Sequence, residues 1–310
     1  AIELEQERRA ALLLELDRPT DALACLEAAH ASAPDQLEGL ESLIAVQRRL
    51  GRIDDEARAL RRLCDRLSTA RRAEPLDRLA TLLEDPIGDL ESAIAARREL
   101  VDLPNAPADA VEGLAALLEL SGRSSELCAL LERERERIGD NAPEARALDL
   151  RRGRLLLDAL GDCEAAAAIF ERLHARAPED EEILGLLERA LRAGRDATGL
   201  CALLARRAEW ARDGVARAPF QLERAQLLEE VLGQPNAACD VYAEIVADAP
   251  HSAASVIAAA RLESLCESTG QWSRLHALLV ERVVTAAEPE RTSLRLRIAD
   301  LCRDRLQDPA

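Results

Sequence analysis

Two sets of helix-breaking residues recur along the chain with nearly the same spacing. One set consists of prolines that close a helical hairpin, and the other consists of glycines that interrupt the following hairpin. A shared period of about 72 residues indicates a repeat protein, in which each unit covers the apolar face of its neighbour. The prolines are Pro34, Pro104, Pro178 and Pro250, and the glycines are Gly51, Gly122, Gly194 and Gly270.

The segment 148–178 contains one complete hairpin. Its leucines and alanines recur at the spacing of an amphipathic helix on both sides of Gly161. Gly161 suits the left-handed conformation that ends a helix, and Asp162 can cap the next helix by accepting backbone N–H bonds. Pro178 cannot continue the second helix, so we expect it to begin the next one. A hairpin of this length takes up about half of the 72-residue period, so each repeat module holds two hairpins.

The sequence contains no sustained alternation of apolar and polar residues that would predict a strand. We predict an all-α fold of about 17 helices, stacked as antiparallel hairpins in a module of about 72 residues. The expected helices span 1–17, 19–33, 35–50, 53–70, 72–84, 86–102, 107–121, 124–138, 143–160, 162–177, 179–193, 196–214, 218–232, 235–248, 251–269, 271–286 and 288–306.

The second helix of some hairpins carries an alanine, three further residues, an aromatic residue and then a closing proline. Ala166 with Phe170 and Ala238 with Tyr242 show this pattern. It resembles the tetratricopeptide repeat. The resemblance implies a right-handed α-solenoid that binds a protein or a peptide on its surface.

Other hairpins depart from the motif. In the hairpin at Asp85-Pro86, we expect Ser92 and Ala96 where the alanine and the aromatic residue would stand. The doubled module is also similar to the very long repeat proteins of GC-rich, myxobacteria-like bacteria, in keeping with 41 basic residues that are all arginine. This similarity implies a bacterial origin.

No linker rich in glycine, serine or proline divides the sequence, so we expect residues 1–310 to form a single array. The chain opens inside a helical pattern at Ile2 and ends at Pro309 with the start of another unit. These features suggest an excised segment of a longer repeat protein. An array without capping helices would expose apolar surface on helices 1–17 and 288–306, which would permit self-association.

The net charge of −17 argues against binding to nucleic acid or to anionic membrane surfaces. No apolar run approaches the roughly 20 residues needed to cross a bilayer. The eight cysteines stand singly, without the spacing of a metal site or a redox pair, which is typical of a reducing compartment such as the cytoplasm. The sequence predicts no metal site and no cofactor.

The candidate binding residues are four arginines. Arg8, Arg152 and Arg224 occupy one repeat position in three different modules, and Arg261 holds the analogous place in an alternate hairpin. In tetratricopeptide repeats the first helix of each hairpin lines the concave groove, and this resemblance implies a ladder of guanidinium groups there. Such groups bind carboxylates through paired hydrogen bonds. The alternative is that each arginine pairs with a nearby glutamate of the chain.

Several other residues have both a structural and a functional interpretation. Glu3 and Glu223 are the nearest candidates for pairing with the arginine ladder. Gly113 and Gly185 stand one module apart inside expected helices, either for close helix contact or to leave room for a ligand. Trp210 is either part of the core or an exposed anchor for a partner.

No catalytic motif occurs in the sequence, and the absence of lysine removes phosphate-loop and Schiff-base chemistry. We therefore expect an interaction scaffold that is not an enzyme. One alternative is a regulatory or substrate-recruiting region of a larger enzyme, kinase or transcription regulator. Another is a scaffold of the cell envelope or of a motility complex.

Overall fold

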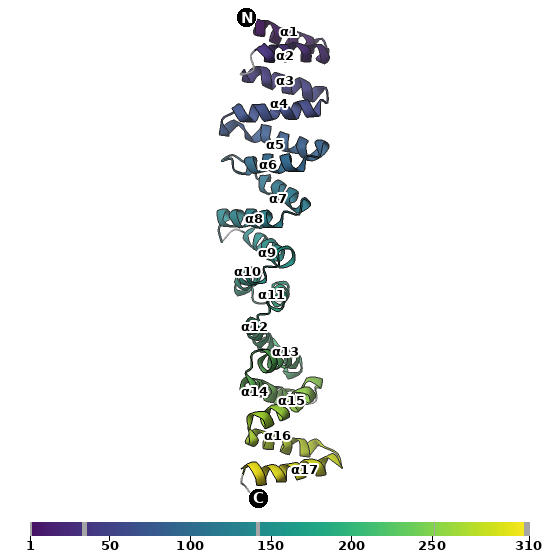
Figure 1. Cartoon of the computed structure of the whole chain (residues 1–310), viewed down its shortest axis with the longest axis vertical. Coiled ribbons are helices and arrows are strands. Elements are labelled where there is room, and N and C mark those ends of the chain that lie inside the picture. Colours follow the sequence, from purple (N-terminus) through teal and green to yellow (C-terminus); the bar gives the residue numbers. More distant parts are fainter. Residues whose placement is uncertain (1, 33–35, 141–142, 251, 307–310) are drawn as a thin grey trace. The chain divides into compact units, whose positions relative to one another are not determined.

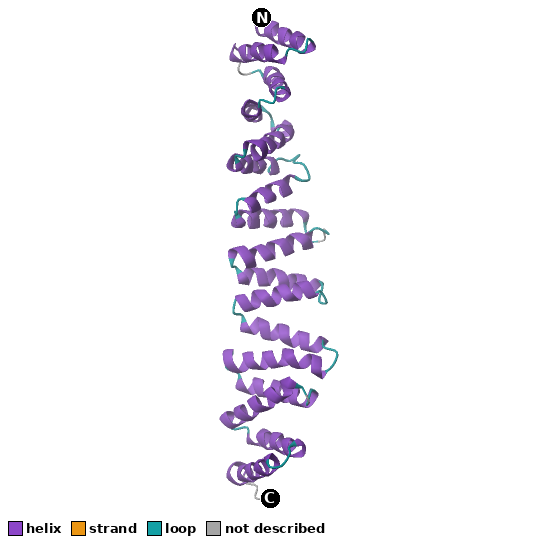
Figure 2. Cartoon of the chain, turned by 90° about the vertical axis from the view of Figure 1, so that its right-hand side faces the viewer, coloured by secondary structure: helices purple, strands orange, loops and turns teal. Residues whose placement is uncertain are grey.

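The computed structural model describes residues 2–32, 36–140, 143–250 and 252–306, drawn as ribbon in Figure 1. Pro34 and Pro309 lie outside the described residues. Within those ranges every regular element is helical and no strand occurs, as Figure 2 shows. The predicted all-α fold is confirmed. Contacts divide the chain into two units, Ala1–Leu160 and Gly161–Ala310, so the expectation of a single array stays a prediction.

The helices follow one another along the chain in the expected number for the described residues. They are α1 (Ile2–Glu15), α2 (Pro19–Ser32), α3 (Leu37–Arg49), α4 (Ile53–Arg66), α5 (Ala73–Leu82), α6 (Leu90–Val101), α7 (Ala110–Leu120), α8 (Ser124–Ile138), α9 (Ala145–Leu155), α10 (Cys163–Arg176), α11 (Glu181–Ala193), α12 (Ala197–Trp210), α13 (Gly214–Gln226), α14 (Pro235–Asp248), α15 (Ala253–Thr269), α16 (Trp272–Thr285) and α17 (Glu290–Leu301).

In each unit a helix packs against the next helix along the chain. The first unit runs in this way from α1 to α9, and the second runs from α10 to α17. The interiors consist mainly of leucine and alanine, because one apolar stripe of each helix faces its neighbours. Stacked helical hairpins are therefore the architecture of both units.

One helix in each module ends in an irregular turn, which is π-helical at three places and a kink with Asp85 in an extended conformation at the first. These turns span Leu83–Ile87, Leu156–Leu160, Leu227–Val231 and Cys302–Leu306, and their starting points recur at close to the module length. The period that the helix breaks predict is thus present in the backbone as well. Apart from Pro86 in the first, these turns carry no helix-breaking residue, so the sequence does not predict their conformation.

The helix caps agree with the sequence in most places and differ in a few. Gly161 has a φ of 68° and Asp162 accepts a hydrogen bond from the Ala165 N–H at 3.1 Å, as predicted. At the break near residue 194 the left-handed residue is Arg195, with a φ of 56°. Gly194 itself has a φ of −75° and keeps a right-handed helical conformation.

Helix α13 begins at Gly214, earlier than the predicted start at residue 218 beside Pro219. The Asp213 carboxylate accepts a hydrogen bond from the Ala216 N–H at 2.8 Å and so starts the helix before the proline. Similarly, α11 begins at Glu181 because Asp180, and not Pro178, caps it. Short polar caps take precedence over proline in both places.

Two buried carboxylates connect successive helices of the first unit. Glu56 on α4 is 2% exposed, and it accepts hydrogen bonds from Arg48 Nε on α3 at 2.9 Å and from Arg78 Nε on α5 at 3.1 Å. Asp149 on α9 is fully buried and accepts a hydrogen bond from Arg135 Nε on α8 at 3.0 Å. A buried carboxylate requires such a partner, so these pairs determine how the helices are aligned.

Exposed apolar side chains are not confined to the first and last helices. Leu16 just after α1 is 69% exposed and Leu296 on α17 is 66% exposed, but Leu120 on α7 and Val256 on α15 are 72% and 71% exposed. The expected apolar surface at the two ends therefore stays a prediction.

Replacement of Asp149 by alanine is expected to lower the free energy of unfolding by about 3 kcal/mol, because Arg135 would keep a buried charge without its buried partner. Urea denaturation followed by circular dichroism measures this change. Asp140, which is largely exposed and pairs with the same arginine, provides the control, and Asp140→Ala should cost less than about 1 kcal/mol. Equal costs for the two variants would contradict the assignment.

Candidate interaction surface

The four candidate arginines do not share one environment. Arg152 on α9 pairs with Glu132 at 2.5 Å, and its side chain is 20% exposed. Arg261 on α15 contacts Glu229 and Glu230 at 3.4 Å and 3.2 Å. Pairing with glutamates of the chain, the structural alternative, therefore occurs at these two positions.

Arg8 and Arg224 differ from this pair. Arg8 is exposed on α1, and the Glu3 side chain lies outside the described part of the chain. Arg224 is partly buried on α13 and makes no ion pair with a described residue. Glu223 pairs with Arg192 on α11 at 2.7 Å instead. Because Arg8 and Arg152 lie in one unit and Arg224 and Arg261 in the other, a common ladder stays a prediction.

Many other arginines connect a helix to the next helix but one along the chain. Arg61 on α4 donates to Glu99 on α6 at 2.6 Å, and Arg274 on α16 donates to Asp240 on α14 at 2.6 Å. On the side of the first helices, Arg151 on α9 contacts Glu119 on α7 at 2.7 Å. These arginines thus tie one hairpin to the next, each pair contributing roughly 1 kcal/mol or less.

Three hollows of the first unit lie between the second helices of successive hairpins, which are α2, α4, α6 and α8. The α2/α4 hollow has a volume of about 400 Å³, the α4/α6 hollow about 640 Å³ and the α6/α8 hollow about 310 Å³. In each case the intervening first helix forms the floor. These hollows are not on the first-helix face, where the resemblance to tetratricopeptide repeats implies the groove.

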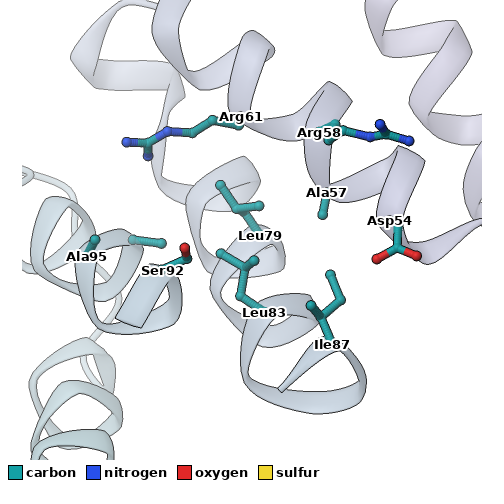
Figure 3. Close-up of a pocket in the computed structure, with 10 residues that line it drawn as sticks. Asp54, Ala57, Arg58, Arg61, Leu79, Leu83, Ile87, Ser92 and Ala95 are labelled. Carbon is teal, nitrogen blue, oxygen red and sulfur yellow. The ribbon is translucent and has the colours of Figure 1, made fainter. Parts of the chain in front are cut away.

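The α4/α6 hollow has an apolar floor and charged edges. Leu79, Leu83 and Ile87 point toward the face of α4 that carries Ala57 (Figure 3). On the opposite wall, α6 contributes Ser92, Ala95 and Ala96. The edges hold Asp54, Arg58 and Arg61, and the two arginines leave α4 in opposite directions (Figure 3).

Small side chains on α6 explain why this hollow is large. Asp89 and Asp162 cap α6 and α10 in the same way, which aligns the two helices residue by residue from the cap onward. Ala96 then corresponds to Ile169 of α10, a larger side chain that is also buried. Small side chains at Ala95 and Ala96 thus leave volume open at this wall of the α4/α6 hollow.

The same alignment corrects the predicted register of α6. Ala93 and Arg97, not Ser92 and Ala96, stand at the alanine and aromatic positions, since Ala93 is fully buried as Ala166 is. Arg97 is 14% exposed along its side chain and pairs with Asp77 at 2.5 Å. The register counted from the Asp85-Pro86 break was wrong by one residue, because the Asp89 cap and not that break fixes where α6 begins.

Arg97 lies beside one of the two recurring glycines. A Cβ atom on Gly113 would lie 3.4 Å from the Arg97 guanidinium, an ordinary van der Waals distance to the end of a flexible side chain, so this contact does not require a glycine. Gly185 is exposed and a Cβ atom there would meet nothing within 4 Å. Close helix contact therefore explains neither glycine, and room for a ligand stays a prediction.

The α2/α4 hollow is more polar. Its walls include His30, Gln47, Arg58 and Arg62. His30 Nδ1 and Gln47 Oε1 are buried atoms without a hydrogen-bond partner among the described residues. Burial, with the nearby positive charges of Arg62 and Arg66, lowers the pKa of His30. Neutral imidazole is therefore the favoured form of His30 near pH 7.

In the second unit, two modules further along the chain, an aromatic ring covers the histidine that corresponds to His30. His174 corresponds to His30, and Trp210 stands where Arg66 stands in the first unit. The two rings lie with centroids 5.7 Å apart, and Trp210 is still 48% exposed. The sequence predicts that Trp210 is either part of the core or an exposed anchor for a partner. It fits both in part, because its ring covers His174 and about half of the residue still faces solvent.

The cysteines stand singly in the sequence, but Cys239 on α14 and Cys266 on α15 are both fully buried and lie close enough for each to affect the pKa of the other. Burial raises the pKa of Cys266 to about 11, which makes its thiolate scarce at neutral pH. Among the residues that the structure describes, no group of three or more possible ligands could hold a metal ion. No described helix is long and apolar enough to cross a bilayer.

Stacked helical hairpins, two of them with an alanine–aromatic motif, define an α-helical repeat architecture that resembles tetratricopeptide repeats. No family model matches the chain, and no curated protein matches it. Among solved structures, one described as Naa15/Naa10 bound to HypK-THB is 13% identical with a TM-score of 0.46 over 98% of this chain, which spans only 50% of that one.

Two structural neighbours are described as tetratricopeptide repeat proteins. One, from Parabacteroides merdae, is 13% identical with a TM-score of 0.34, and the match covers 85% of this chain and 98% of that one. The other, TTC0263 from Thermus thermophilus, is 22% identical with a TM-score of 0.25, covering 61% and 98%. Likenesses at this level concern the fold and not the partner.

The buried His174 should make stability depend on pH. Burial and the charge of Arg206 lower its pKa, so the unfolded chain binds a proton more readily than the folded chain. Its neutral form therefore stabilises the fold above pH 6.5, and this contribution is lost as the pH falls from 6.5 through the lowered pKa of the folded state.

Urea denaturation at pH 7.5, 6.5 and 5.5 should show a smaller loss of stability for His174→Gln than for the unaltered chain. The carboxylates titrate in both proteins and cancel in the comparison. Parallel curves for the two proteins would contradict the argument.

Proposed function

We propose that this chain is a protein-interaction scaffold that binds a partner without performing chemistry on it. The single observation that carries this proposal is the row of hollows between alternate second helices, above all the α4/α6 hollow of about 640 Å³. An apolar floor with a few charged groups at its edge is typical of a binding surface. Scattered single thiols support a reducing compartment as its location.

Capture of partners from a lysate compares two candidate surfaces, the α4/α6 hollow and the predicted arginine ladder on the first helices of the hairpins. The Ala95→Trp variant fills the α4/α6 hollow, because Ala95 is exposed and lines it. Its matched control is Ala168→Trp, at the corresponding exposed position of α10. A third bait carries Arg152→Glu and Arg224→Glu and tests the arginine ladder.

Partners retained by unaltered protein from a lysate of the source organism should be lost from Ala95→Trp and kept by Ala168→Trp. Quantitative mass spectrometry with circular dichroism of each bait measures this outcome. If the arginine bait alone loses partners, the first-helix face is the binding surface. If all baits retain one set, neither surface is used.

A further inference from the structure

Two hollows of different character lie on either side of α4. The α2/α4 hollow is polar, and the α4/α6 hollow has an apolar floor. Arg58 lines both of them, since it stands on the ridge that separates them. A chain that lies across α4 would therefore meet two pockets of opposite chemistry in succession.

The carboxylates around the α2/α4 hollow pair with arginines of the chain, but one of its arginines makes no ion pair with a described residue. Its two carboxylates are neutralised by the chain itself, because Arg52 pairs with Asp55 at 2.5 Å and with Glu27 at 3.6 Å, and Arg58 also pairs with Asp55. Arg62 lines the same hollow, is exposed, and makes no ion pair with a described residue. In a chain with a net charge of −17, this is a local positive site.

Two buried polar atoms add a second observation at this hollow. Gln47 is 5% exposed, and its Oε1 has no hydrogen-bond partner among the described residues. His30 Nδ1, in the wall of the same hollow, is buried and also lacks one. Gln47 Oε1 can only accept a hydrogen bond, so it calls for an N–H donor such as a backbone amide of a bound segment, whereas the neutral His30 ring can donate from Nδ1 to a carboxylate. Unpaired buried polar atoms are costly, so a bound segment that supplies both groups is favoured.

The apolar hollow on the other side of α4 suits a large side chain. Its volume of about 640 Å³ exceeds the need of one aromatic ring, and its floor consists of Leu79, Leu83 and Ile87. The area that such a side chain loses to solvent makes its burial favourable. The two hollows thus favour a carboxylate on one side of α4 and an apolar group on the other.

We propose that α4 is the docking ridge for an extended acidic segment of a partner protein, with a carboxylate at Arg62 and a large apolar side chain in the α4/α6 hollow. A helix is about 10 Å wide, and an extended chain advances about 3.3 Å per residue. The acidic and the apolar residues therefore stand about three positions apart in the partner. This inference rests on the proposed function and names the chemistry of its partner.

Selection from a phage-displayed library of random dodecapeptides on the whole chain tests the proposal. Enriched peptides should share an aspartate or glutamate about three positions from phenylalanine, tyrosine, tryptophan or leucine. A synthetic member of the enriched set then gives affinities by fluorescence polarisation. Arg62→Glu and Ala95→Trp should each weaken binding roughly tenfold, since each removes one of the two contacts.

The repeat supplies matched controls for both variants. Arg206 corresponds to Arg62 two modules further along the chain, and Ala168 corresponds to Ala95. Arg206→Glu and Ala168→Trp should leave the affinity within about twofold, because those positions lie on α12 and α10 of the other unit. Thermal denaturation of all four variants shows that each is folded.

Proton NMR of the histidine rings gives a second measurement that a change in stability would not mimic. A carboxylate bound beside Arg62 offsets the positive charges that lower the pKa of His30, so peptide binding should raise that pKa. His174, which Trp210 covers, should not respond to the peptide.

The outcomes separate this inference from the proposed function. Enrichment of basic peptides, or binding that neither Arg62→Glu nor Ala95→Trp weakens, overturns the docking ridge and leaves the scaffold proposal in place. Self-association that Ala95→Trp abolishes would make a second copy the occupant and also overturns it. A chain that captures neither a peptide nor a protein partner contradicts both proposals.

Discussion

The contact between each helix and the next one is the interaction on which this structure depends. An amphipathic helix has one apolar stripe, and here that stripe has nowhere to be buried except against its neighbours. Only five residues of the chain are aromatic, so leucine and alanine must form the interior. Alanines such as Ala166 and Ala238 let the helices approach closely, and the fully buried Phe170 and Tyr242 fill the remaining space.

Arginine has two distinct roles because the apolar contacts leave the edges of the stack charged. Several arginines, such as Arg61 and Arg274, hold a carboxylate two helices away and so align successive hairpins. Arg62 lacks such a carboxylate among the described residues, although it belongs to the same helix as Arg61. In a strongly acidic chain, an arginine is available to a partner's carboxylate only where the nearby carboxylates of the chain already pair with other arginines.

Helix-breaking residues made the number and order of the helices predictable from the sequence. The π-helical turns, the Asp213 cap and the left-handed Arg195 were not predictable, because several residue types satisfy the same local geometry. The site was less predictable still. Arg152 and Arg261 could be found by their repeat position, but their glutamate partners depend on which side chains α8 and the turn after α13 bring near.

The hollows could not be predicted from the sequence for a related reason. Each is bounded by side chains of two helices that are separated by a third, and the α4/α6 hollow also depends on the small Ala57, Ala95 and Ala96. A register counted from the Asp85-Pro86 break does not show that Ala96 corresponds to Ile169. An alignment on the capping aspartates, Asp89 and Asp162, would have revealed it.

Contacts in each unit join residues that are close in sequence, since each helix packs chiefly on those beside it in the chain. Loop closure therefore costs little entropy, and assembly can begin at any pair of adjacent helices and spread outward. Loss of a terminal helix removes only one such interface. Under a pulling force, a unit of this kind yields in small successive steps and re-forms readily when the tension is released.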